Sequence, residues 1–391
     1  MSNKNPLFHA PHLNASQAID PQSIVALTSG DPSSIAPFIT LKAWLELRHT
    51  KYNFFLIENH HYINDLIKLF KLDIKTHVIN EVSEASSIFK DALPILSIPA
   101  SQLGIINDLE RTTKERTLYL GKRLVYNSKS LLYSLDKAIE LALNHEVKAI
   151  VTNPLDKDLV NNFIEAKSGS IGNQLNSPKF LGHTEYLADK SWHVDPVMMM
   201  ATPYNKLKVV PITTHVSLKN AITSLSIEHI IKVATKTSNF LQKHYHITNP
   251  KLVLTGLNPH SGENGLMGTE EQEIIIPAIK ALNNLGINCQ GPLPGDTVFT
   301  AYNINTYDVI LGMYHDQVLG PFKALYFDEG VNVTIGLPFI RTSPDHGTAF
   351  DLIDLEHLAE NEQLTFLDNN ICEKSLIAAI KMAHLLSATT I

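Results

Sequence analysis

Short apolar runs alternate along the chain with longer amphipathic segments. The apolar runs are SIVALTSG, NFFLIEN, KAIVTNP, PVMMMATP, LKVVPITT, KLVLTG, DVILGMY and VNVTIGL, and each is typical of a strand buried on both faces. Residues 129–146, 226–245 and 269–286 have the periodicity of helices, and Thr269 and Gly286 suit the start and stop of the last one. This alternation predicts an α/β fold with a largely parallel sheet.

The chain is long enough to bury a large core. Its 391 residues favour two domains, or one domain with elaborations. Residues 1–22 are polar with scattered prolines and predict a flexible lead, whereas no internal repeat or sharp linker interrupts residues 23–391. Residues 163–180 are rich in Ser, Gly and Asn and predict a loop insertion.

Charge and cysteine content exclude several classes of function. With 39 acidic and 32 basic residues, the formal net charge is -7, which offers no general attraction for nucleic acid. Cys289 and Cys372 are too few for a disulfide framework or a thiolate zinc site. The N-terminus lacks an apolar signal core, and no apolar stretch is long enough to span a membrane. We therefore expect a cytoplasmic protein that contacts neither nucleic acid nor membrane.

Three histidines follow directly after strand-like runs. VVPITTH ends at His215, LVLTGLNPH at His260 and VILGMYH at His315. Ligands gather at the carboxyl ends of strands in open α/β sheets, and three protein ligands with open positions are typical of a catalytic metal site. Each histidine could equally be a hydrogen-bonded loop residue, so both interpretations stay open. Asp316 and Asp296 are candidates to orient the imidazoles or complete the coordination, although Asp296 also suits a turn.

Two further polar sets are candidates for substrate binding. FLGHTEYLA contains His183 and Thr184, of which Thr184 could equally be a helix N-cap. Lys323, Asn332 and Arg341 lie near strand-like runs, where Lys and Arg suit a phosphate or a carboxylate. A single Lys or Arg is more often a solvated surface residue.

The sequence lacks a G-x-G-x-x-G motif between a strand and a helix near the N-terminus. The glycines of SGENGLMG have a related spacing, but that pattern is weak. The loop DHGTA offers backbone amides and small side chains that could lie against an adenosine. Its residues are Asp345, His346, Gly347, Thr348 and Ala349.

Several motifs occur in an order that is specific to one family. GHTEYLA, TTHVSLK, GLNPHSGENGLMGTEE, GPLPGDTVF, MYHDQ, NVTIGLPFIRT and DHGTAF together resemble the 4-hydroxythreonine-4-phosphate dehydrogenase family of pyridoxal phosphate biosynthesis. The likeness runs from about residue 24 to about residue 355. It implies an isocitrate/isopropylmalate-dehydrogenase-like fold of two interleaved α/β subdomains with a cleft between them. It also implies a homodimer with the active site at the subunit interface.

The resemblance also implies roles for the candidate residues. The histidines of TTH, NPH and YHDQ would hold one divalent metal (zinc, magnesium or cobalt), and the two polar sets would hold a small phosphorylated hydroxy amino acid. The loop 345–349 would hold NAD or NADP. The implied reaction is oxidation of 4-phosphooxy-L-threonine to 2-amino-3-oxo-4-phosphooxybutanoate, which decarboxylates to 3-amino-2-oxopropyl phosphate. Lys323 is the candidate for proton transfer or phosphate contact.

The chain departs from the family pattern in three places, one of which is residues 163–180, where the gap between TNPLDK and GHTE is longer than usual. GDPSSIAPF stands where the family usually has GDPAGIGPE, and Val318 stands where the family has Gly. These departures, together with the missing G-x-G-x-x-G motif, which alone favours a hydrolase, leave alternatives open. One is a sister dehydrogenase that acts on a 4-phosphorylated threonate or erythronate, another is a metal-dependent hydrolase without nicotinamide, and a third is a remnant that binds ligand without turnover.

Overall fold

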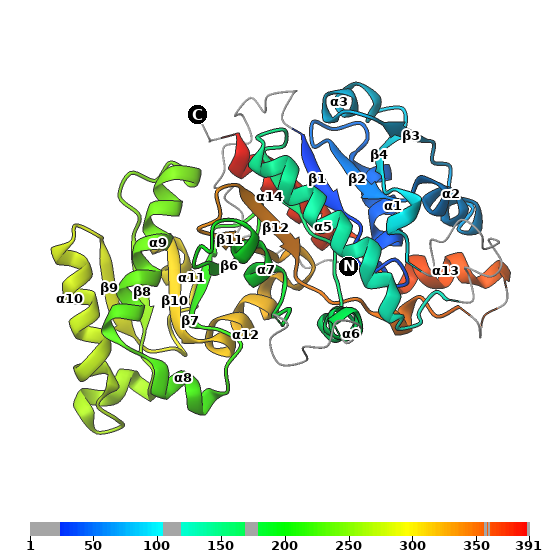
Figure 1. Ribbon diagram of the computed structural model, residues 1–391. Coiled ribbons are helices and arrows are strands. Elements are labelled where there is room, and N and C mark those ends of the chain that lie inside the picture. The colour runs from blue at the N-terminus through cyan, green and yellow to red at the C-terminus, as the bar shows by residue number, and fades with distance from the viewer. Residues whose placement is uncertain (1–23, 105–118, 169–178, 356–357, 359, 389–391) are drawn as a thin grey trace. The chain divides into compact units, whose positions relative to one another are not determined.

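The computed structural model describes residues 24–104, 119–168, 179–355, 358 and 360–388, and these form two compact units. The flanking unit consists of Ile19–Val194 and Leu337–His384. The middle unit contains Asp195–Gly336 and the end of the chain from Leu385. The chain therefore forms the first part of the flanking unit, then the middle unit, and then the rest of the flanking unit (Figure 1).

The flanking unit contains a parallel sheet with the strand order β3-β4-β2-β1-β5-β12. Because β1 lies between β2 and β5, the order of the chain reverses at β1, and ligands bind at such a reversal in open α/β sheets. The strands are β1 (Val25–Thr28), β2 (Phe54–Glu58), β3 (Thr76–Ile79), β4 (Leu93–Ser97), β5 (Ala149–Val151) and β12 (Ile340–Pro344).

Helices cover the sheet of the flanking unit. Helix α5 packs on β1, β2 and β5 (Figure 1). The face of α5 that is buried includes Leu131, Leu135 and Ala138. Among the described residues of this unit, the helices are α1 (Ala36–Leu47), α2 (His60–Leu69), α3 (Ala85–Ile88), α5 (Ser128–Leu143), α6 (Lys157–Ser168), α7 (His183–Lys190), α13 (Glu360–Asn370) and most of α14 (Lys374–Ser387).

The middle unit contains a mixed sheet with the strand order β11-β6-β7-β10-β8-β9. Strand β6 runs antiparallel to β11 and β7, whereas β7, β10, β8 and β9 pair in parallel. The strands are β6 (Val197–Ala201), β7 (Val209–Thr213), β8 (Leu252–Thr255), β9 (Cys289–Leu293), β10 (Val309–Tyr314) and β11 (Val331–Ile335). The helices are α8 (Leu218–Ser224), α9 (Ile227–Tyr245), α10 (Ile276–Asn284), α11 (Ala301–Thr306) and α12 (His315–Tyr326).

The α/β class and the largely parallel sheet are confirmed. Every apolar run quoted above forms a strand, and Gly286 ends the helix region 269–286 with a left-handed backbone (φ 80°). Within this largely parallel arrangement, PVMMMATP forms strand β6, which runs antiparallel to both of its neighbours. No helix among the described residues is long and apolar enough to cross a membrane.

The predicted loop at 163–180 starts later than expected. Helix α6 continues through Ser168 because Leu159, Val160 and Phe163 recur at helical spacing and are buried. Residues 169–178 lie outside the described residues, as does the predicted lead over 1–22.

The turn after β1, residues 29–38, accommodates its departures from the family pattern. Within residues 29–38 only Gly30 has a left-handed backbone (φ 69°), and a Cβ there would come within 2.7 Å of the Asn153 Cβ. Ser34 and Ala36, which replace glycines, therefore occupy ordinary backbone conformations. Phe38, which replaces an acid, is fully buried and meets the ring of Phe70 edge-on at 5.3 Å.

Val318 is accommodated by a glycine on the neighbouring strand. Val318 is fully buried on α12, and a Cβ added to Gly312 of β10 would come within 2.3 Å of its Cγ1. The same Cβ would lie 3.1 Å from Oε1 of Gln317. Val318 therefore fills the space that a side chain at position 312 would need.

Gly312→Ala is expected to destabilise the protein by about 1 to 3 kcal/mol through overpacking. Val318→Ala in the same chain should recover about 1 kcal/mol or more of that loss, because it removes the clashing methyl group. Urea unfolding of the wild type, both single variants and the double variant measures this coupling. Additive losses would show that the two residues do not compete for space.

Candidate functional site

Four predicted residues follow four neighbouring strands of the middle unit. His215 comes after β7, His315 after β10, His260 after β8 and Asp296 after β9, and the strands lie in the order β7-β10-β8-β9. Because these strands are parallel and adjacent strands are about 4.8 Å apart, their carboxyl ends share one edge. The rings of His215 and His315 lie 6.0 Å apart between centroids.

A glutamine that sequence reasoning missed ties two of these strand ends together. Gln317 Oε1 accepts hydrogen bonds from the Met313 N–H (2.7 Å) and the Thr255 hydroxyl (2.8 Å). Its Nε2 donates to the Gly256 carbonyl at 2.7 Å. Gln317 lies two residues after His315 in the HDQ motif, so its position beside a predicted ligand was the available signal.

The loop that carries His260 is held by a buried glutamate. Glu271 is 2% exposed, and its Oε1 accepts the backbone N–H groups of Leu257 and Asn258, both at 2.8 Å. Its Oε2 accepts from the Asn258 amide at 2.9 Å. This glutamate was also missed, although it lies in the GTEE segment that marked the helix start.

The His260 loop has an unusual backbone. His260, Ser261, Glu263 and Asn264 have φ between 43° and 58°, and Gly262 between them has φ 75°. Such left-handed conformations cost about 1 to 2 kcal/mol per non-glycine residue and occur mainly where function requires them. His215 also has a positive φ of 24°.

The three imidazoles fit a metal site in their donor chemistry and in their place on one edge. In the described part of the chain, however, no three His, Cys, Asp or Glu side chains lie close enough together to hold a metal ion. Asp316 Oδ1 accepts a hydrogen bond from His315 Nδ1 at 2.7 Å, which suits the orientation of a ligand imidazole. Asp296 is exposed in the turn after β9.

Lys323 and Asn332 also belong to the middle unit. Lys323 is half-buried on α12 rather than at a strand end. Asn332 is half-buried on β11, and its Oδ1 is buried with no hydrogen-bond partner among the described residues. An unsatisfied buried oxygen is costly, so a ligand donor would complete this position.

Arg341 lies within strand β12 of the flanking unit, and its guanidinium is buried. Nε and Nη2 donate to the Thr152 hydroxyl at 3.2 and 2.6 Å. Burial lowers the pKa of Arg341 to about 10, and the nearby Glu185 carboxylate partly offsets this effect. The side chain stays charged at neutral pH.

His183 and Thr184 begin helix α7. The N-cap is Gly182, so the interpretation of Thr184 as an N-cap was wrong. The pKa of His183 is held well below its ordinary value, first by burial and then by the charges of Arg341 and Lys157. His183 is therefore a neutral imidazole at pH 7.

The expected cofactor loop connects β12 to a short helix. The Asp345 N–H donates to Ser375 Oγ at 3.1 Å, and the Thr348 carbonyl accepts from the Ile35 N–H at 3.2 Å. A Cβ added to Gly347 would meet nothing within 4 Å. The loop is thus held at its ends and open at its centre.

His346 and Ala349 complete this loop. Nε2 of His346 is buried without a hydrogen-bond partner among the described residues, and burial lowers the pKa of this imidazole. Ala349 has a left-handed backbone (φ 41°). A ligand that binds in the open space at Gly347 could supply a polar group to the unsatisfied ring nitrogen of His346.

The first turn of the flanking unit contains a buried carboxyl group. Asp31 is 1% exposed, and its Oδ1 accepts from the N–H and the hydroxyl of Ser33, both at 2.9 Å. The Ser33 hydroxyl also lies 2.8 Å from the Lys122 carbonyl, so its single proton is shared between that oxygen and Asp31 Oδ1, and it accepts from the Asn127 amide at 3.1 Å. Burial raises the pKa of Asp31 to about 6, although the bonds from Ser33 oppose the shift.

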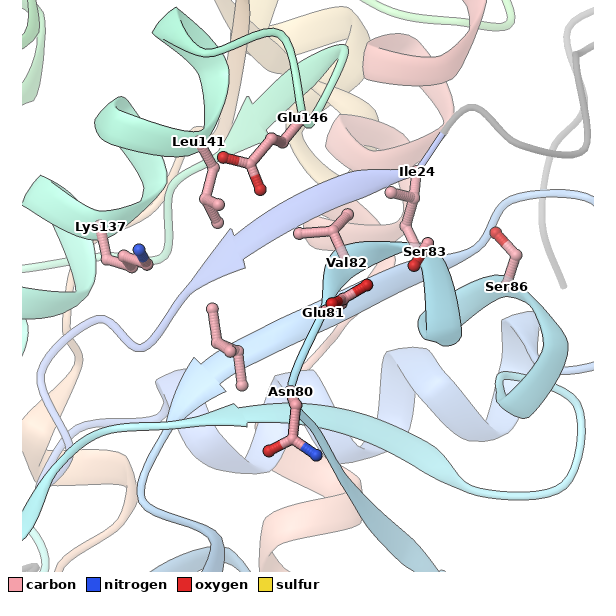
Figure 2. A pocket seen from close by; sticks show the side chains of 10 residues that line it. Ile24, Asn80, Glu81, Val82, Ser83, Ser86, Lys137, Leu141 and Glu146 are labelled. Carbon is pink, nitrogen blue, oxygen red and sulfur yellow. The ribbon is translucent and has the colours of Figure 1, made fainter.

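A separate pocket of about 610 Å³ lies elsewhere in the flanking unit. Figure 2 shows Lys137 and Leu141 of α5 and Glu146 across from Asn80 and Glu81, which follow β3. None of the predicted site residues lines this pocket.

Imidazoles follow parallel strands of the middle unit, and the carboxyl group of Asp31 follows β1 of the flanking unit. Polar groups at the carboxyl ends of parallel strands are typical of α/β enzymes. Nucleotide-dependent dehydrogenases are a large part of this class. The chain belongs to the family described as pyridoxal phosphate biosynthetic protein PdxA, whose profile matches residues 50–383.

Individual relatives agree with this family. The 4-hydroxythreonine-4-phosphate dehydrogenase of Bradyrhizobium diazoefficiens is 38% identical over 341 residues, which cover 84% of this chain and 90% of the relative. The enzyme of that name from Methylorubrum extorquens is 37% identical over 93% of this chain and 94% of its own. The solved structure of the Klebsiella pneumoniae enzyme is 30% identical with a TM-score of 0.70, covering 91% of this chain and 99% of that one. The protein is therefore a dehydrogenase of pyridoxal phosphate biosynthesis, as the motifs predicted.

Asp31→Asn is expected to flatten the pH dependence of stability. The carboxyl group has a pKa of about 3.9 in an unfolded chain and about 6 in the folded protein, so the folded state binds more protons between these values. Stability should therefore fall by up to about 3 kcal/mol as pH rises from about 4 to about 7, and the asparagine variant should lack this loss.

The measurement is the free energy of urea unfolding of both proteins across that pH range. Asp91→Asn, in the turn before β4, serves as a control that should retain the wild-type slope. Parallel pH profiles for the wild type and Asp31→Asn would contradict the prediction.

Proposed function

We propose that the protein oxidises 4-phosphooxy-L-threonine at C3 with NAD or NADP, using one divalent metal ion. The product, 2-amino-3-oxo-4-phosphooxybutanoate, is a β-keto acid that loses carbon dioxide to give 3-amino-2-oxopropyl phosphate. The observation that carries this proposal is the set of three imidazoles at the ends of neighbouring parallel strands in a member of this family. The substrate is the one named for the relatives.

His215, His260 and His315 would hold the metal, since neutral imidazoles are common ligands of divalent transition metals. When bound, such an ion supplies Lewis-acid chemistry that lowers the pKa of a substrate hydroxyl group. Asp316 would orient His315 through the 2.7 Å hydrogen bond. The exposed Asp296, which follows β9 beside the strand that leads to His260, would orient an imidazole or complete the coordination.

The remaining residues would bind the charged and polar groups of the substrate. Arg341 presents a permanent charge fixed by Thr152, and Lys323 supplies a second cation or transfers a proton. Asn332 offers a buried carbonyl oxygen that would accept from a substrate N–H or O–H group. His183 and Thr184 would add an imidazole and a hydroxyl group from the start of α7.

The cofactor would bind at the loop from Asp345 to Ala349. The open centre at Gly347 and the unsatisfied nitrogen of His346 support this position. We further propose a cytoplasmic homodimer with its active site at the subunit interface. Sedimentation with and without substrate tests that assembly.

The direct test follows NADH absorbance with a panel of substrates in the presence of zinc, magnesium or cobalt. 4-Phosphooxy-L-threonine should be oxidised with the highest kcat/KM, and 3-amino-2-oxopropyl phosphate should accumulate. Preference for a 4-phosphorylated threonate or erythronate would instead identify a sister dehydrogenase. Turnover without nicotinamide would indicate a hydrolase, and binding without turnover would indicate a remnant.

His260→Ala is expected to lower metal affinity by at least about 100-fold, because removal of a ligand should cost more than loss of an outer-shell partner. Activity should fall in parallel while the thermal unfolding midpoint of the metal-free protein stays within a few degrees. Elemental analysis after dialysis against limiting metal provides the readout. His145→Ala is the matched control, since His145 is exposed and has a similar positive φ of 61°. Equal metal content in the two variants would remove His260 from the site.

Gly347→Val is expected to raise the KM for NAD about tenfold, equivalent to about 1.4 kcal/mol of lost binding. The new side chain points into open space, so the fold should tolerate it and the cofactor should meet it. The KM for the phosphorylated substrate serves as an internal control and should change little. Equal effects on both KM values, or none, would place the cofactor elsewhere.

A further inference from the structure

Two opposite charges approach the backbone at Gly182. This glycine is buried and has φ 149°, and a Cβ there would lie 3.0 Å from Glu185 Oε2 and 3.1 Å from Lys157 Nζ. The absence of a side chain at Gly182 therefore lets both charged ends reach the start of α7.

The same place lies within the electrostatic reach of Arg341. After burial, the charges of Arg341 and Lys157 lower the pKa of His183, the next residue. The charge of Glu185 raises the pKa of Arg341 against the effect of burial. Lys157 is the first residue of α6, five positions after Thr152, which anchors the Arg341 guanidinium. The segment from the end of β5 to the start of α6 thus supplies Thr152, which binds the Arg341 guanidinium, and Lys157 itself.

We propose that Lys157 is a substrate-binding residue that, together with Arg341, holds the phosphate of the substrate beside His183. This inference rests on the proposed function and adds a residue to it. Lys157, Arg341 and Glu185 together carry a net charge of +1, which favours binding of an anion. His183 is neutral and adds a donor or an acceptor rather than a third charge.

An exposed lysine is ordinarily a solvated surface residue. Lys157 differs because its Nζ lies against the backbone of a residue that must be glycine, next to two predicted substrate residues. A lysine suits this role because its ammonium group is a point charge on a flexible stem that can approach phosphate oxygens from several directions. Glu185 attracts the same ammonium group, which would hold Lys157 near the site before substrate arrives.

The experiment compares Lys157→Gln, Lys157→Arg and Lys190→Gln. Lys190 lies at the end of α7 and serves as the control for loss of one nearby surface charge. For 4-phosphooxy-L-threonine, Lys157→Gln should lower kcat/KM about 10- to 100-fold, as expected for a charge-assisted phosphate contact. For unphosphorylated 4-hydroxythreonine the loss should be less than about threefold. Lys157→Arg should recover much of the activity, and Lys190→Gln should resemble the wild type.

A second arm keeps the test independent of the reaction. Inorganic phosphate should raise the thermal unfolding midpoint of the wild type and of Lys190→Gln but have a much smaller effect on Lys157→Gln. If the wild type oxidises no substrate in the panel, the proposed function fails, and this phosphate arm still decides the role of Lys157. Equal losses on both substrates, or equal stabilisation of all variants by phosphate, would overturn the proposal.

Discussion

Parallel pairing of β7, β10, β8 and β9 is the constraint on which the site of the middle unit depends. Parallel strands cannot be joined by tight hairpins. After each of these strands, the chain therefore leaves the sheet at the same edge and returns through a crossover connection. The residues after the strands then become neighbours, although long stretches of sequence separate them. This arrangement brings His215 and His315 to 6.0 Å between ring centroids. It also creates backbone groups at the strand ends that need partners.

Two side chains meet that need, and both stabilise the predicted metal-binding loops. Gln317 satisfies backbone groups of Met313 and Gly256 at neighbouring strand ends, while Glu271 accepts two N–H groups of the loop that leads to His260. These bonds help to offset the left-handed backbone that follows from His260 onward. The hydrogen bonds of Glu271 therefore hold the strained His260 loop in place without a bound ligand.

The sequence predicted what depends on local pattern and missed what depends on distant contacts. The eight strands that form apolar runs were recognisable, and the histidines were recognisable by their places after three of them. Strands β3, β4, β9 and β12 were not predicted: β3 has two exposed residues, CQGPL in β9 contains Gly and Pro, and IRTSP in β12 contains Arg and Pro. The bonds of Gln317 reach residues up to 62 positions away, so periodicity gave no signal for them.

The first turn shows how a departure from the family pattern can leave the polar structure intact. Replacing two glycines and an acid with Ser34, Ala36 and Phe38 requires no left-handed backbone and places an aromatic ring in the core. Asp31 remains buried beside this turn, although its ionised form opposes folding above pH 6. A packing residue of similar size would carry no such penalty. The Ile35 N–H of the same turn donates to the Thr348 carbonyl, so the turn that contains the buried carboxyl group is hydrogen-bonded directly to the proposed cofactor loop.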